Sequence, residues 1–90
     1  MKHYNIKIYG LVQGIGFRWS VRHEARKLNL SGFVRNQPDG SVYLEAEGEP
    51  SDLEKLLAWC QKGPLWARVE KVEFEESVSK GYNIFEIKTS

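Results

Sequence analysis

YGLVQGIGFRWSVRHEA, residues 9–25, decides the fold, because it joins a strand-like segment to a helix-like one through a glycine-rich turn. Upstream, Tyr4, Ile6 and Ile8 alternate with polar residues, as in a half-buried strand. Downstream, apolar residues recur at intervals of four, four and three, on one face of a helix; they are Phe17, Val21, Ala25 and Leu28. The stretch predicts a strand that ends near Val12, a tight turn and a helix.

The middle of the chain predicts a hairpin and a second helix. Residues 32–36 and 41–47 have strand patterns and are joined by QPDG, whose proline and glycine favour a turn. Ser51 and Glu54 have the spacing of a capping box at a helix start. The apolar face of this helix consists of Leu53, Leu56, Leu57 and Cys60, and the helix ends at Gly63 and Pro64.

The last third predicts two more strands. In residues 67–76 the apolar positions change parity, so we expect a bulge near Glu70 and Lys71. YNIFEIK, residues 82–88, is a short closing strand. The order of elements is typical of an α+β ferredoxin-like sandwich, in which two helices cover one face of an antiparallel sheet.

Length and composition predict one small globular domain, residues 1–90. With 41% apolar and 28% charged residues and a net charge of +1, the chain has no strong field for nucleic acid or membrane. The single Cys60 forms no internal disulfide, which favours a reducing compartment. The first residues contain no long apolar run, so we expect a cytoplasmic protein.

The glycine-rich turn has the composition of an anion-binding loop. Gly10, Gly14 and Gly16 allow tight turning, so successive N–H groups can point to one anion, and the free N–H groups of the next helix open onto the same place. Arg18 lies in the first helical turn, where its charge opposes the helix dipole unless an anion lies between them. From the loop alone, a phosphate site and a merely structural turn both stay open.

Two motifs give the chain a resemblance to the acylphosphatase family. GLVQGIGFR is similar to the family's first signature, a glycine, then Val-Gln-Gly, an aliphatic residue, a variable position and Phe-Arg. GFVRNQPDGSVYLEAEG is similar to the second, in which an aromatic after glycine leads to an asparagine and a turn. The resemblance covers nearly the whole chain, including GPLWARVEKVE. The visible departure in the loop is Ile15, where valine is common.

The resemblance implies hydrolysis of the carboxyl–phosphate bond of acyl phosphates. It implies that Arg18 binds the phosphate and that Asn36 positions the water, so these two are the expected catalytic residues. The substrate-binding residues that it implies are Gln13, Gly14, Ile15, Gly16, Phe17 and Arg18. Gln13 also suits a scaffolding role in the loop.

Hydrolysis of an acyl phosphate requires few catalytic groups from the protein. The leaving carboxylate has a conjugate acid of pKa about 4, so it needs no general acid. Water attack in line then depends on positioning and electrostatics. Neither metal-ligand spacing nor a cysteine in the loop is present, so we expect no metal, no cofactor and no covalent intermediate.

Two other classes of protein domain, RNA recognition motifs and non-catalytic ligand-sensing domains, share this order of strands and helices. An RNA recognition motif has aromatic residues on its third strand, but here Tyr43 is flanked by Glu45 and Glu47, which repel phosphates. A non-catalytic sensing domain differs by its lack of turnover. We therefore expect a monomer with a small acyl phosphate as substrate, inorganic phosphate as product and inhibitor, and no nucleic-acid or membrane partner.

Histidines and tryptophans are predicted to have structural roles. His3 lies near the chain start and His23 on the polar side of the first helix, so neither is expected to act in catalysis. Trp19, Trp59 and Trp66 are expected to be core or semi-buried packing residues.

Overall fold

Strands and helices follow one another in the predicted order. A computed structural model describes residues 1–89, so Ser90, the end of the predicted domain, lies outside the described residues. The elements are β1 (Lys2–Leu11), α1 (Phe17–Lys27), β2 (Ser31–Asn36), β3 (Val42–Gly48), α2 (Pro50–Lys62), β4 (Arg68–Ser77) and β5 (Phe85–Lys88). Neither helix within residues 1–89 has the length and apolar character needed to cross a membrane.

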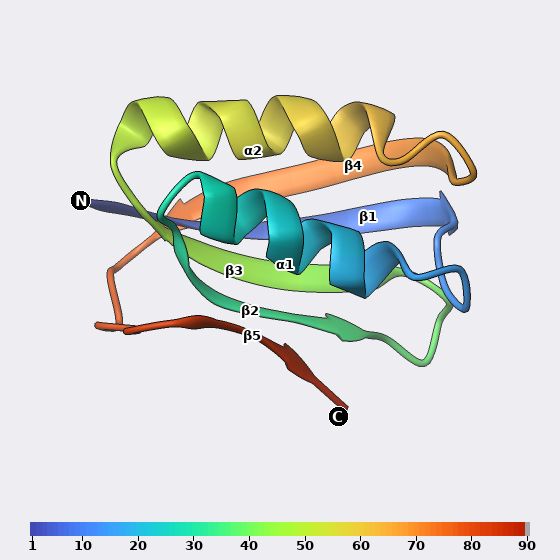
Figure 1. The fold of residues 1–90 in the computed structure, drawn as a ribbon, viewed down its shortest axis with the longest axis horizontal. Coiled ribbons are helices and arrows are strands. Elements are labelled where there is room, and N and C mark those ends of the chain that lie inside the picture. The colour runs from blue at the N-terminus through green and yellow to red at the C-terminus, as the bar shows by residue number, and fades with distance from the viewer. Residues whose placement is uncertain (90) are drawn as a thin grey trace.

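The strands form one sheet in the order β4-β1-β3-β2-β5, and both helices lie over the same face (Figure 1). The ferredoxin-like α+β fold is therefore as predicted. The expectation of a fully antiparallel sheet is wrong for one pair, because β5 runs parallel to β2, with Gly32 opposite Phe85. The last residue of β4 and the first residue of β2 lie at the same end of the sheet, on strands that are not neighbours. The chain crosses the sheet at that end and returns as β5 in the same direction as β2.

The core lies between the sheet and the helices, and the predicted apolar faces build it. Tyr4, Ile6 and Ile8 point from β1 toward the helices and are buried. The predicted face of α1 is buried except for Leu28, which is half-buried. The whole predicted face of α2 is buried: Leu53, Leu56, Leu57 and Cys60.

The start of α2 differs from the prediction. Pro50 is the first helical residue, and Glu49 is the N-cap, without a side-chain cap. Ser51 lies inside the first turn, so it cannot form the predicted capping box. The Glu54 carboxylate instead accepts a hydrogen bond from the Tyr4 hydroxyl, and this bond, with burial, raises the pKa of Tyr4 to about 12.

The predicted bulge in β4 is confirmed at the end of β1. Tyr9 lies opposite Lys71 and Gly10 opposite Val69, which leaves Glu70 as the extra residue. Gly10 has φ 132°, and a Cβ there would lie 2.1 Å from the carbonyl oxygen of Arg68. Glycine therefore lets β1 and β4 approach closely just before the glycine-rich loop.

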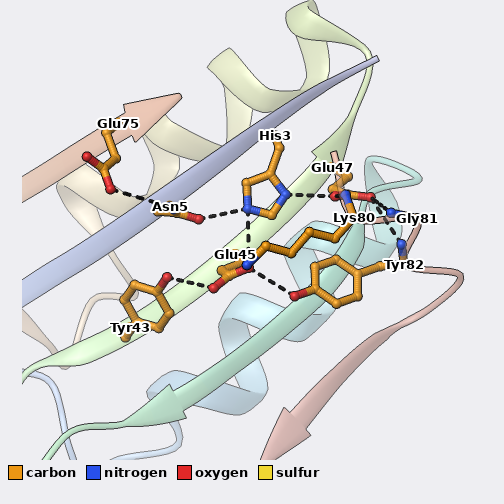
Figure 2. A network of polar contacts seen from close by, with 9 residues as sticks. All are labelled: His3, Asn5, Tyr43, Glu45, Glu47, Glu75, Lys80, Gly81 and Tyr82. Atoms are coloured by element: carbon orange, nitrogen blue, oxygen red, sulfur yellow. Dashed lines mark hydrogen bonds and ion pairs between the residues drawn. The ribbon is translucent and has the colours of Figure 1, made fainter. Parts of the chain in front are cut away.

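The other face of the sheet carries a buried polar cluster at the start of β1. The segment that joins β4 to β5, residues 78–84, which we call the strap, lies against it (Figure 2). We call the side chains of the cluster the His3 cluster; they are His3, Asn5, Tyr43, Glu45, Glu47, Lys80 and Tyr82. His3, Glu45 and Glu47 are buried.

Glu47 ties the strap to the sheet. Its carboxylate accepts the backbone N–H groups of Lys80, Gly81 at 3.0 Å and Tyr82 at 3.1 Å, and its Oε2 lies 2.7 Å from Nδ1 of His3. Burial by itself raises the pKa of this carboxyl. The backbone N–H of Lys80, the His3 ring and the other strap N–H groups outweigh burial and hold the pKa of Glu47 below its ordinary value.

The Glu45 carboxylate is also fully hydrogen-bonded, in this case by side chains. It accepts hydrogen bonds from the hydroxyls of Tyr43 at 2.7 Å and Tyr82 at 2.9 Å and from the Lys80 ammonium at 3.2 Å. Nε2 of His3 is 3.2 Å from Glu45 Oε1. These contacts outweigh burial and lower the pKa of the Glu45 carboxyl. The polar groups of the His3 cluster thus find their partners within the chain.

Candidate active site

The glycine-rich loop joins β1 to α1 at the opposite end of β1 from the His3 cluster (Figure 1). Gly14 and Gly16 have φ of 76° and 78°, in the left-handed region. A Cβ at either glycine would meet nothing within 4 Å. Backbone conformation, and not lack of space, therefore selects glycine at these two positions.

The N-terminus of α1 faces the loop without a side-chain cap. Gly16 is the N-cap, and the first helical hydrogen bond runs from the Ser20 N–H to the Gly16 carbonyl, at 3.1 Å. The N–H groups of Phe17, Arg18 and Trp19 come before that bond and therefore have no carbonyl partner within the helix. The first turn contains no acidic residue. These donors and the positive end of the helix dipole favour an anion.

A cavity of about 230 Å³ lies at this helix end. It brings together the loop, the first turn of α1 and the last residue of β2, although Arg18 and Asn36 are far apart in the sequence. Its lining residues are Val12, Gly14, Gly16, Phe17, Arg18, Trp19, Asn36 and Ile87.

Asn36 has an unpartnered oxygen in this region. Within residues 1–89, its side-chain Oδ1 is buried and has no hydrogen-bond partner. A buried acceptor of this kind costs about 1–3 kcal/mol unless something donates to it. An amide oxygen in this condition beside a cavity is a suitable acceptor for a water or a ligand hydroxyl.

Gln13 connects the loop to the turn that follows Asn36. Its Nε2 donates to the carbonyls of Gln37 and Ser41, both at 2.8 Å. Asp39 braces the same turn by accepting from the backbone N–H of Ser41 at 2.9 Å. The Ser41 hydroxyl and N–H, with Lys7, lower the pKa of Asp39 to about 2. Gln13 therefore scaffolds the loop with its amide nitrogen.

The structure gathers most of the predicted site residues around the cavity. Gly14, Gly16, Phe17, Arg18 and Asn36 line it. Gln13 and Ile15 lie outside the lining: Gln13 braces the neighbouring turn, and Ile15 packs partly against the core.

Three lining residues were missed by the sequence analysis. Val12 and Ile87 supply apolar wall, and Trp19 lies at the start of α1. The direct neighbours of a glycine motif are an available signal for Val12 and Trp19, but Ile87 reaches the cavity only through the parallel placement of β5.

The packing expectation is wrong for two tryptophans. Trp19 is 56% exposed and stacks on His23, and Trp66 is 62% exposed. Trp59 is half-buried, as expected, and lies against Phe17 with ring centroids 5.9 Å apart. Trp19 lies in the first turn of α1, and Trp66 lies in the segment between α2 and β4; the core covers neither side chain.

Comparison with known proteins identifies the family to which this chain is similar. The Acylphosphatase family model matches residues 4–87. An acylphosphatase of Thermococcus kodakarensis is 47% identical over 83 residues, which cover 92% of this chain and 91% of that one. The crystal structure of acylphosphatase from Bacillus subtilis matches with a TM-score of 0.94 at 37% identity, over 98% of this chain and 99% of that chain.

A second solved structure, an acylphosphatase from Coxiella burnetii, gives a TM-score of 0.93 at 38% identity, over 97% of this chain and 92% of that chain. The fold and these matches define a ferredoxin-like domain of the acylphosphatase type. The chain belongs to the acylphosphatase family. It is therefore an enzyme of the hydrolase class.

Proposed function

We propose that this protein hydrolyses acyl phosphates in the cavity at the α1 N-terminus, by attack of water on phosphorus in line with the departing carboxylate. The P–O bond to the acyl group breaks as the bond to water forms, which yields a carboxylate and inorganic phosphate. The observation that supports the proposal is that Arg18, the uncapped first turn of α1 and Asn36, whose side-chain oxygen has no partner within residues 1–89, line one cavity.

Arg18 and the loop bind the phosphoryl group in this proposal. The guanidinium of Arg18 offers two parallel donors to phosphoryl oxygens, and the N–H groups around Gly14, Gly16 and Phe17 bind the others. In this proposal the donors are preorganised, so they stabilise the charge that spreads over the equatorial oxygens in the transition state.

Asn36 orients the attacking water. Its amide is neutral at ordinary pH, so it does not act as a strong base. The unpartnered Oδ1 accepts a hydrogen bond from the water, which directs a lone pair of the water toward phosphorus. A phosphate oxygen of the substrate accepts the proton that the water releases.

No further catalytic group is required by this chemistry. The carboxylate leaves without a proton, so neither a general acid nor a metal is needed at the leaving oxygen. Cys60 is buried in the core, and burial raises the pKa of its thiol, which disfavours a cysteine nucleophile. We propose a small acyl phosphate as substrate, inorganic phosphate as a competitive inhibitor, and a monomer in the cytoplasm.

Hydrolysis of acetyl phosphate in ¹⁸O-labelled water with excess chelator tests the proposal. We expect turnover, with one ¹⁸O in the phosphate and none in the acetate. Label in the acetate would instead show attack at carbon. A loss of activity that a divalent ion restores would contradict the metal-free mechanism. Simple phosphomonoesters serve as a control and should react very slowly, because an alkoxide leaving group needs an acid or a metal.

A further inference from the structure

Trp66 makes a hydrogen bond that packing does not explain. Its side chain is 62% exposed, yet its indole Nε1 lies 2.6 Å from the backbone carbonyl oxygen of Ile15, to which it donates. Trp66 belongs to the segment between α2 and β4, and Ile15 to the glycine-rich loop. One exposed side chain from a distant segment thus fixes a backbone group in the loop.

Because a peptide unit is planar, this hydrogen bond also fixes the direction of the N–H of the following residue, Gly16. The carbonyl of Ile15 and the N–H of Gly16 belong to the same peptide, which is trans, so they point in opposite directions. Gly16 lines the cavity, whereas Trp66 lies outside its lining. Holding the Ile15 carbonyl toward Trp66 therefore directs the N–H of Gly16, a residue that lines the cavity, away from Trp66.

The peptide needs such a restraint because its rotation depends on ψ of Ile15 and φ of Gly16, and glycine leaves φ unrestricted in sign. Gly14 and Gly16 have no Cβ, and no atom lies within 4 Å of the place where one would be. Glycine populates positive and negative φ about equally, so the Ile15–Gly16 peptide can reverse at little steric cost. A reversed peptide would direct its carbonyl oxygen, and not its N–H, at a bound anion.

We propose that Trp66 is a positioning residue, whose indole N–H holds the Ile15–Gly16 peptide in the orientation that donates to a phosphoryl oxygen. It touches neither substrate nor water and acts through the backbone. The proposal rests on the proposed function for the identity of the anion, but the orientation of the peptide is a property of the unliganded protein.

Trp66→Phe removes the N–H and keeps an aromatic ring. A neutral hydrogen bond changes the balance between two orientations by about 3- to 10-fold. Because only one orientation binds, the dissociation constant for inorganic phosphate and KM for acetyl phosphate should both rise, by at most that factor, while kcat changes less than 2-fold. The thermal midpoint should fall by no more than a few degrees, since the side chain is largely exposed and loses one hydrogen bond.

Leu65→Ala is the matched control, because Leu65 is the exposed neighbour of Trp66 in the same segment. It should leave KM, the phosphate dissociation constant and kcat at the wild-type values. Equal rises in KM for Trp66→Phe and Leu65→Ala would overturn the proposal, because the whole segment would then matter and not the hydrogen bond.

The residual dipolar coupling of the Gly16 N–H, measured without phosphate, tests the orientation directly. It should change in Trp66→Phe and stay constant in Leu65→Ala. An unchanged coupling in Trp66→Phe would overturn the role of Trp66 whether or not the protein hydrolyses acyl phosphates. If the wild-type protein turns over no acyl phosphate but the coupling still changes in Trp66→Phe, the proposed function is contradicted and the positioning role is supported.

Discussion

The two ends of β1 differ in how their polar groups are satisfied. At its start, Glu45 and Glu47 are buried, and hydrogen bonds from the strap, two tyrosines and His3 surround them. At its end, α1 begins without a side-chain cap beside a cavity that Asn36 lines, and the buried Asn36 side-chain oxygen has no hydrogen-bond partner within residues 1–89. A polar region that satisfies itself contributes to stability, and one with donors and an acceptor to spare is suited to a ligand.

This contrast predicts that substitutions at the two ends separate activity from stability. Changes in the loop and on Asn36 should reduce turnover and leave the free energy of unfolding nearly constant. Changes in the His3 cluster should do the reverse. Each of the predictions below compares one end with the other.

Arg18→Gln should have the largest effect on activity. It removes the charge and the two-donor fork, so kcat/KM should fall by about 10³-fold or more, and Arg18→Lys, which keeps the charge, should lose about 30- to 1,000-fold, or 2–4 kcal/mol. Without ligand, Arg18 opposes the helix dipole, so the free energy of unfolding should rise by a few tenths of a kcal/mol or stay constant. Steady-state kinetics and denaturant titration measure both. A folded Arg18→Gln protein with wild-type activity would show that Arg18 does not bind the phosphoryl group.

Glu47→Gln should have the largest effect on stability. It replaces a buried acceptor of three backbone N–H groups by an amide that cannot accept from all of them, so the free energy of unfolding should fall by about 3–5 kcal/mol. Glu76→Gln is the control with the same change of charge, because Glu76 pairs with Lys2 at the surface, and it should cost less than about 1 kcal/mol. Similar losses for the two variants, or a loss of kcat/KM in folded Glu47→Gln, would contradict the comparison.

Asn36→Ala should lower kcat by about 10²-fold, because the water loses its acceptor while the phosphate keeps its donors. The dissociation constant for inorganic phosphate should change less than 3-fold. Calorimetry with phosphate and kinetics with acetyl phosphate separate the two effects. An unchanged kcat with only a raised KM would exclude Asn36 from water positioning.

Part of the pH dependence of stability should come from the His3 cluster, in addition to the contributions of Asp39 and Glu73, whose pKa values are also lowered. The pKa values of Glu45 and Glu47 are held below their ordinary value of 4.5, so the unfolded chain binds protons at these groups more readily than the folded one. The free energy of unfolding should therefore fall as pH drops below about 4.5, until the folded-state pKa values are passed. Denaturant titrations between pH 7 and pH 3 measure this fall, and it should be shallower in Glu47→Gln. An equal slope in wild type and Glu47→Gln would mean that other carboxylates carry it.

The contrast also explains which features the sequence could predict. The core faces follow from spacing, so Tyr4, Ile6 and Leu53 were placed correctly. The loop and Asn36 were found because they form motifs, and the cavity gathers Arg18 with Asn36. The roles of these residues in catalysis stay predictions.

The His3 cluster could not be predicted from the pattern along the chain. Glu45 and Glu47 alternate with Leu44 and Ala46, which is the pattern of a strand with a solvent-exposed face. They are buried because the strap crosses that face, and the crossing follows from the parallel placement of β5. Trp66 was missed for a related reason, since its hydrogen bond joins segments that only the tertiary fold brings together.

A titration of the ¹⁵N-labelled protein with inorganic phosphate, in excess chelator, tests the central claim most directly. The account predicts saturable shifts in the amide resonances of Gly14, Gly16, Phe17 and Arg18. It predicts no shift at Gly81 and Tyr82, whose N–H groups already donate to Glu47. Saturable shifts at the strap, or none at the loop, would contradict it.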